Sequence, residues 1–132
     1  VDFQVVVLDD RPEFLTSVVF PEAQERLLVD FEDISQVVHL KEHDYAVVMT
    51  RGHLYDLMLH QQLLQTPAYY LGGMGSRHKV AVMIQKLQEA GYTKEQIQRI
   101  HMPIGLPIKA ESPAELAISI AGELILARAE KK

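Results

Sequence analysis

The sequence predicts one α/β domain over residues 1–132, with a mostly parallel sheet flanked by helices. Runs of consecutive apolar residues recur along the chain without alternation, which is typical of strands buried on both faces of a parallel sheet. Segments with helical periodicity and recognisable helix starts lie between these runs. The resulting order of strand, helix, strand, strand, helix, strand, helix indicates an α/β fold.

The composition is that of a globular domain with its own core, since 48% of the residues are hydrophobic and 23% are charged. The net charge of −5 argues against a nucleic-acid surface. No apolar run approaches membrane-spanning length and no signal peptide is recognisable. The chain has no cysteine, which excludes disulfides and thiolate metal ligands within it. The absence of cysteine is compatible with the cytoplasmic location that we expect.

Three strands are expected in the first half of the chain, at residues 5–8, 27–29 and 45–50. The first strand ends at an acidic pair, Asp9 and Asp10. Pro12 suits the first turn of a short helix that residues 14–19 extend. Residues 32–44 are mixed and polar, as expected for a short helix and a loop.

A helix is predicted over residues 53–65, and Pro67 ends it before a fourth strand at residues 68–71. Four of its apolar residues are expected on one side: Leu54, Leu57, Met58 and Leu64. The next helix begins at Ser76 and ends at Gly91, which fits a C′ position. Its apolar face toward the sheet should consist of Val80, Met83, Ile84 and Leu87.

Two later helices begin with ordinary capping signals. Thr93 opens one with a capping-box pattern, and Ser112 opens the other, with Pro113 at the first helical position. Residues 101–110 between them contain two prolines and a glycine, which favours an extended connection. The last helix carries one apolar stripe: Leu116, Ile120, Leu124 and Ala127.

The helix beginning at Ser76 is preceded by a glycine-rich segment: Gly72, Gly73, Met74 and Gly75. Such a strand–loop–helix can expose backbone N–H groups to an anion. Three cationic or titratable residues, Arg77, His78 and Lys79, occupy the first turn, where the helix dipole favours anions. A bound phosphate would remove this conflict. Arg77 is the expected charge partner and Lys79 is expected in solvent, while a tight turn without a ligand is the alternative.

Three segments follow strands and should converge beyond the carboxyl ends of the sheet: residues 9–11, 50–53 and 72–78. Asp9 or Asp10 could accept hydrogen bonds from ribose hydroxyls or could cap the helix at Pro12. The glycine fingerprint that precedes such an acid by about 20 residues in dinucleotide-binding folds is not in this sequence. The predicted ligand-binding residues are Asp9, Asp10, Arg11, Thr50, His53, Gly72, Gly73, Met74, Gly75, Ser76 and Arg77.

For residues 50–53 a solvated turn is an equal alternative, and Asp56 could simply favour the dipole of its own helix. The six histidines do not indicate a metal site, because no third ligand accompanies the pairs His39/His43 and His53/His60. His39, His43 and His60 are expected on the surface, and no nucleophile–base–orienter set is recognisable.

Several segments in a fixed order resemble the C-terminal Rossmann-like domain of the XdhC/CoxI family. They are residues 9–14, 20–21, 72–77 with Lys79, 103–106, and 112–117 with 119–120. The resemblance implies an accessory protein that binds molybdenum cofactor (molybdopterin, in some cases as a dinucleotide), protects it, helps its sulfuration and delivers it to a molybdenum hydroxylase such as xanthine dehydrogenase. Turnover of a substrate is not implied.

Family members carry an N-terminal domain and a glycine-rich first strand–loop before the acidic motif. The chain is therefore expected to be a fragment whose sheet lacks that unit and has an open edge or a central gap. The expected partners are the hydroxylase apoenzyme, a cofactor sulfurase and a second copy of the chain. Two alternatives stay open: an NAD(P)-type dinucleotide-binding domain of an oxidoreductase, and a docking module without a small ligand.

Overall fold

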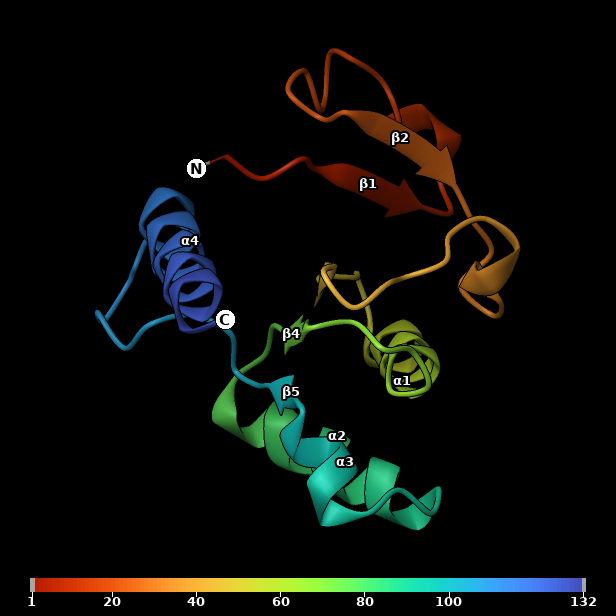
Figure 1. The fold of residues 1–132 in the computed structure, drawn as a ribbon, viewed down its shortest axis with the longest axis vertical. Coiled ribbons are helices and arrows are strands. Elements are labelled where there is room, and N and C mark those ends of the chain that lie inside the picture. Colours follow the sequence, from red (N-terminus) through yellow and green to blue (C-terminus); the bar gives the residue numbers. More distant parts are fainter. Residues whose placement is uncertain (1, 132) are drawn as a thin grey trace.

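The computed structural model describes residues 2–131 as an α/β fold, as the apolar runs predict (Figure 1). Its strands are β1 (Val6–Asp9), β2 (Glu25–Leu28), β3 (Tyr45–Val48), β4 (Tyr70–Gly73) and β5 (Ile100–His101). Its helices are α1 (His53–Leu63), α2 (Arg77–Glu89), α3 (Lys94–Gln98) and α4 (Pro113–Glu130), with 3₁₀ turns η1 (Pro12–Phe14) and η2 (Ile34–Gln36). None of the helices in this range combines the length and apolar character needed to cross a bilayer.

All strand pairs are parallel, and they form two separate sheets (Figure 1). One sheet pairs β1 with β2, and the other has the order β3–β4–β5. Within residues 2–131, β1 pairs only with β2 and β3 pairs only with β4, so each of these two strands has one edge without a strand partner. The expected open edge or gap is thus present between the two sheets.

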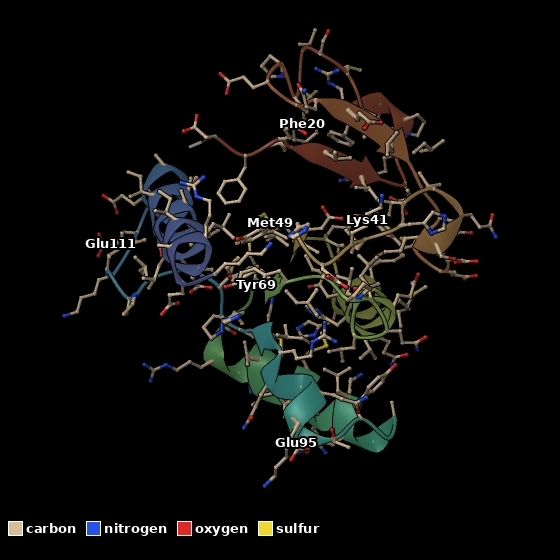
Figure 2. All side chains as sticks on the ribbon, viewed as in Figure 1. Phe20, Lys41, Met49, Tyr69, Glu95 and Glu111 are labelled. Atoms are coloured by element: carbon tan, nitrogen blue, oxygen red, sulfur yellow. The ribbon has the colours of Figure 1, made fainter. Side chains whose placement is uncertain are left out.

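Helices cover both faces of the three-stranded sheet, with α4 on one side and α1, α2 and α3 on the other (Figure 1). The larger core packs residues of α1, α2 and α3 against β3, β4 and β5, with Leu71 and Leu87 almost fully buried. The smaller core joins Tyr70 and Ile104 to Ile120 of α4, and the predicted stripe of that helix packs there. Figure 2 shows Met49 and Tyr69 near the centre, with Phe20 and Glu95 toward opposite ends.

The predicted helix starts are confirmed. Thr93 and Ser112 form complete capping boxes, with the side chains of Gln96 and Glu115 reaching back to the N-cap N–H groups. The α2 helix ends at Glu89, and Gly91 (φ 99°) follows at the predicted C′ position, where its N–H donates to the carbonyl of Gln88. These helix starts and stops are patterns of a few adjacent residues, and such patterns can be recognised from the sequence alone.

Three local expectations are wrong. Residues 15–19 do not extend η1. Gly72 and Gly73 end strand β4 instead of forming a loop. The apolar side expected for α1 is wrong at Leu54, which is 68% exposed; Leu57 and Leu64 do pack in the core, together with Leu59, His60 and Leu63. Packing against β4 and α2 selects the buried side, and the apolar residues of α1 are too evenly spread around the helix to reveal it.

Candidate functional site

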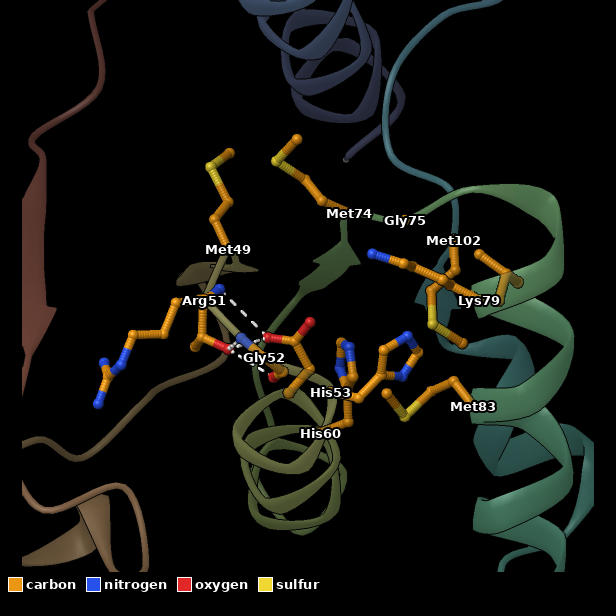
Figure 3. A pocket seen from close by; sticks show the side chains of 13 residues that line it. Met49, Arg51, Gly52, His53, His60, Met74, Gly75, Lys79, Met83 and Met102 are labelled. Atoms are coloured by element: carbon orange, nitrogen blue, oxygen red, sulfur yellow. Dashed lines mark hydrogen bonds between the residues drawn. The ribbon is translucent and has the colours of Figure 1, made fainter.

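A cavity of about 450 Å³ lies where the three-stranded sheet presents its carboxyl ends (Figure 3). Residues directly after β3, β4 and β5 contribute to its wall, as does the N-terminal part of α1 and of α2. Its lining consists of Met49, Thr50, Arg51, Gly52, His53, Asp56, His60, Met74, Gly75, Lys79, Val80, Met83 and Met102. Parallel α/β sheets bind ligands at this end, and the volume suits a small molecule.

The corner between β3 and α1 is held by Thr50 and Asp56. The N–H of Thr50 donates to the Asp56 carboxylate at 3.2 Å, and the Thr50 hydroxyl donates to the same oxygen. Asp56 also lies in the first turn of α1, where the helix dipole favours a carboxylate. His53 follows this corner and lines the cavity. Thr50 and His53, two of the predicted ligand-binding residues, therefore both belong to the cavity wall.

The corner between β4 and α2 has the capacity to bind an anion. Ser76 caps α2 by accepting a hydrogen bond from the N–H of Lys79 at 3.2 Å. Over the described residues, the N–H groups of Ser76, Arg77 and His78 have no hydrogen-bond partner. Unpaired N–H groups at a helix start are donors that a phosphate can satisfy.

Two cationic residues line the cavity, Lys79 and Arg51, and Arg51 is paired with Asp10. The Lys79 side chain runs from α2 toward Met74 at the end of β4 (Figure 3). Lys79 is exposed, as expected, but it also lines the cavity, whereas Arg77, the expected charge partner, is not among the lining residues. Met74 and Gly75 line the cavity as expected, and Gly75 (φ 156°) adopts a backbone angle that favours glycine.

Gly72 and Gly73 allow close packing beneath the cavity. A Cβ on Gly72 would lie 2.7 Å from the Ile104 side chain, and one on Gly73 would lie 2.7 Å from the His60 ring. Neither glycine lines the cavity. Gly73 therefore allows α1 to pack closely on β4, and Gly72 allows the segment after β5 to do so.

The segment after β1 lies outside the cavity and is joined to it by one ion pair. The Arg51 guanidinium donates to both Asp10 oxygens at 2.9 and 3.0 Å and points away from the cavity (Figure 3). Asp9 accepts from the side chain and N–H of Arg11, and the Arg11 hydrogen bond lowers the pKa of Asp9. Neither carboxylate caps η1, so the capping alternative is wrong. Of the three segments predicted to converge, residues 50–53 and 72–78 both contribute to the cavity wall, and residues 9–11 lie beside it.

His60 was expected on the surface and is instead only 2% exposed. Its ring packs against Gly73, and within residues 2–131 its Nδ1 has no hydrogen-bond partner. Burial lowers the pKa of His60, so its imidazole is neutral at neutral pH. The sequence signal was its place between Leu59 and Leu63, which share its side of α1.

Sequence reasoning also missed a methionine wall. Four of the five methionines in the chain line the cavity: Met49, Met74, Met83 and Met102. Three of them directly follow a strand and one lies on α2, so their convergence depends on sheet order. No group of three or more His, Asp or Glu residues in the described range is placed to hold a metal ion.

The profile of the XdhC Rossmann domain family matches residues 1–124. The chain belongs to this family. The family membership expected from the sequence motifs is confirmed, and the cavity lies within an XdhC Rossmann domain.

Several known proteins are similar to this XdhC domain. YqeB of Escherichia coli K12 is 30% identical over 124 residues, or 93% of this chain and 23% of YqeB. The Bacillus subtilis 168 protein named as a probable xanthine dehydrogenase subunit is 30% identical over 126 residues, or 96% of this chain and 36% of that protein. The molybdenum cofactor insertion chaperone PaoD of E. coli K12 is 32% identical over 73 residues, or 55% of this chain and 23% of PaoD.

A crystal structure of a xanthine dehydrogenase from Bacillus halodurans superposes with a TM-score of 0.84 at 27% identity. The match covers 98% of this chain and 38% of that chain. The XdhC domain thus spans a quarter to two-fifths of the length of these relatives.

Proposed function

We propose that this XdhC domain binds molybdenum cofactor within an accessory protein that matures a molybdenum hydroxylase such as xanthine dehydrogenase. The observation that carries the proposal is the cavity at the carboxyl ends of β3, β4 and β5, which Gly75 and Lys79 line, with the unpaired N–H groups of residues 76–78 in the segment between these two residues. Molybdenum cofactor is a pterin that ends in a phosphate or a nucleotide diphosphate. A relative named as a cofactor insertion chaperone adds independent support.

The residues around the cavity fit such a ligand. The N–H groups of Ser76 and Arg77 and the ammonium of Lys79 would hold the phosphate. Thr50 and His53 would contact the ligand from the opposite side, while Asp10 and Arg51 brace the rim. When bound, the cofactor supplies the metal centre for its recipient enzyme, and the domain binds and orients it.

The first test is ligand identity. Full-length protein purified from cells that make molybdenum cofactor should release a pterin on denaturation, detected by its fluorescence after oxidation. Nicotinamide dinucleotide without pterin would contradict the proposal and support an NAD(P)-binding oxidoreductase domain. No small molecule at all would support a docking module.

The second test separates the charges at the start of α2. Lys79→Gln should weaken cofactor binding by about 10- to 100-fold, the range of a lost charge-assisted hydrogen bond of about 1.5–3 kcal/mol. Arg77→Gln should have a smaller effect, because its side chain does not line the cavity. Lys86→Gln, in the last turn of the same helix, is the matched control. Equal affinity of the Lys79 variant and the control would remove this phosphate site.

The recipient enzyme in this proposal is the apoenzyme of a molybdenum hydroxylase. Two further partners are expected: a cofactor sulfurase and a second copy of the chain. Cofactor-loaded full-length protein should restore activity to purified apo-hydroxylase, and the Lys79→Gln variant should do so less well at equal protein concentration.

A further inference from the structure

The cavity has two chemically different ends along one side of α2. Lys79 and the unpaired N–H groups lie at the start of the helix, and Met83 lies one turn further on. At a rise of 1.5 Å per residue, about 9 Å of helix separates the N–H of Arg77 from Met83. A ligand along this side would place a phosphate at one end and another group, a few bonds away, at the other.

We propose that His60, Met83 and Met102 form a subsite for the planar nitrogen heterocycle of that phosphorylated ligand. The inference rests on the proposed function. It assigns a binding site to the ring of the ligand, whereas the start of α2 binds only its phosphate. Figure 3 shows the His60 ring pointing from α1 toward α2, with Met83 and Met102 on either side of it. Met102 and His60 also meet at Gly73, where a Cβ would lie 3.3 Å from Met102 and 2.7 Å from the ring.

His60 supplies the polar specificity of this subsite. It is only 2% exposed, yet its Nδ1 has no partner in the described part of the chain, and such a group is costly to bury unpaired. A neutral imidazole has one donor and one acceptor nitrogen, and the edge of a nitrogen heterocycle presents the same two kinds of group. A bound heterocycle would supply the hydrogen bond that the neighbouring residues do not provide.

The methionines supply the flat apolar contact. Among the described residues that line the cavity there is no Phe, Tyr or Trp, so the four methionines provide most of its large apolar side chains. Thioether sulfurs make favourable contacts with aromatic rings, and the flexible methionine side chain adapts to the shape of its neighbour. Met83 is only 4% exposed and lies against the larger core, which fixes one face of the subsite.

Two kinds of ligand share this chemistry, namely a phosphorylated pterin and a purine nucleotide, and methyl NMR of the full-length protein distinguishes them. Methionine methyl groups are labelled with ¹³C and assigned by Met→Leu variants. The probes are 6-hydroxymethylpterin, its phosphate, AMP and inorganic phosphate. The pterin probes should shift the Met83 and Met102 methyls through the ring current. Met58, on α1 outside the cavity, is the internal control.

Variants test the polar contact. His60→Leu should weaken binding of both pterin probes by about three- to tenfold, and His60→Gln should retain part of the affinity. Lys79→Gln should weaken only the phosphorylated probe. Because His60 is buried, circular dichroism of each variant confirms folding, and a Met83→Leu variant tests the subsite independently of His60.

Each outcome decides between the two proposals. Binding of inorganic phosphate without any pterin or AMP shift at Met83 and Met102 overturns the ring subsite and leaves the phosphate site standing. If Lys79→Gln leaves the methyl shifts caused by the phosphorylated pterin unchanged, the ring subsite is supported and the phosphate site is removed. Shifts with AMP alone support the subsite but assign it to a nucleotide, which contradicts the proposed cofactor.

Discussion

The buried imidazole of His60, for which we propose a ligand contact, lies where a stable fold would favour an apolar side chain. Its unpaired Nδ1 has lost water without gaining a hydrogen bond. His60→Leu should therefore raise the free energy of unfolding by about 1 kcal/mol while it weakens ligand binding. Urea denaturation of the ligand-free protein measures this change. A destabilised variant would show that the imidazole stabilises the fold through its packing on Gly73.

The same residue predicts a pH dependence. Burial lowers the pKa of His60 from its ordinary value of 6.5, and the Asp56 charge opposes this only in part. The unfolded chain therefore binds the proton more tightly, and stability falls as the pH drops below about 6.5. His60→Leu lacks this contribution, so its stability advantage over the parent should grow between neutral pH and about pH 5. A constant difference across that range would contradict the expected shift.

At the scale of elements, the contact between β4 and α1 depends on the absence of a side chain at Gly73. Gly73→Ala would put a Cβ 2.7 Å from the His60 ring and should cost about 1–3 kcal/mol of stability through overpacking. Combining it with His60→Ala should recover part of the loss, since the two residues are in contact. Gly52→Ala is the control, because the nearest atom, on Tyr55, lies 3.9 Å away. Thermal unfolding of the parent, Gly73→Ala, His60→Ala and the double variant completes the cycle.

The attachment of α4 depends on a buried hydroxyl. Tyr70 is 1% exposed and donates to Glu123 of α4, whose other oxygen accepts from the Gly105 N–H at 3.1 Å. Tyr70→Phe should cost about 1–3 kcal/mol because Glu123 then loses a donor in a partly buried place. Tyr69→Phe, which removes a 2.8 Å bond to the Ala127 carbonyl at a more exposed position, should cost less. Equal losses in denaturation would contradict this ranking.

Elements whose signals are local could be predicted from the sequence, and elements that depend on neighbours could not. The capping boxes at Thr93 and Ser112 and the stop at Gly91 are complete within a few residues. The buried side of α1 and the strand position of Gly73 depend on packing against other elements. For the site, the sequence indicated the start of α2, but the methionine wall is assembled from four separate segments.

At the scale of the whole molecule, one ion pair bridges the two sheets. Arg51 follows β3 and Asp10 follows β1, and their bidentate contact spans 41 positions of the chain. Both side chains are partly exposed, so the pair contributes less than about 1 kcal/mol to stability. Its structural effect is to hold the end of β1 beside the rim of the cavity. The two sheets are therefore separate in their strand pairing but are linked next to the cavity by this ion pair.

The unpaired edges of β1 and β3 predict how the 132-residue chain behaves alone. An exposed parallel edge with apolar residues is a template for further strand pairing, and Val6 of β1 is 40% exposed. The isolated chain should therefore self-associate with rising concentration in sedimentation velocity. Val6→Lys should reduce this association, because a charge on an edge strand disfavours pairing. Val18→Lys, at a site 89% exposed and outside the strands, should leave it unchanged. If Val18→Lys abolishes association instead, the contact is a surface apolar patch, and the strand edges are not what joins the copies.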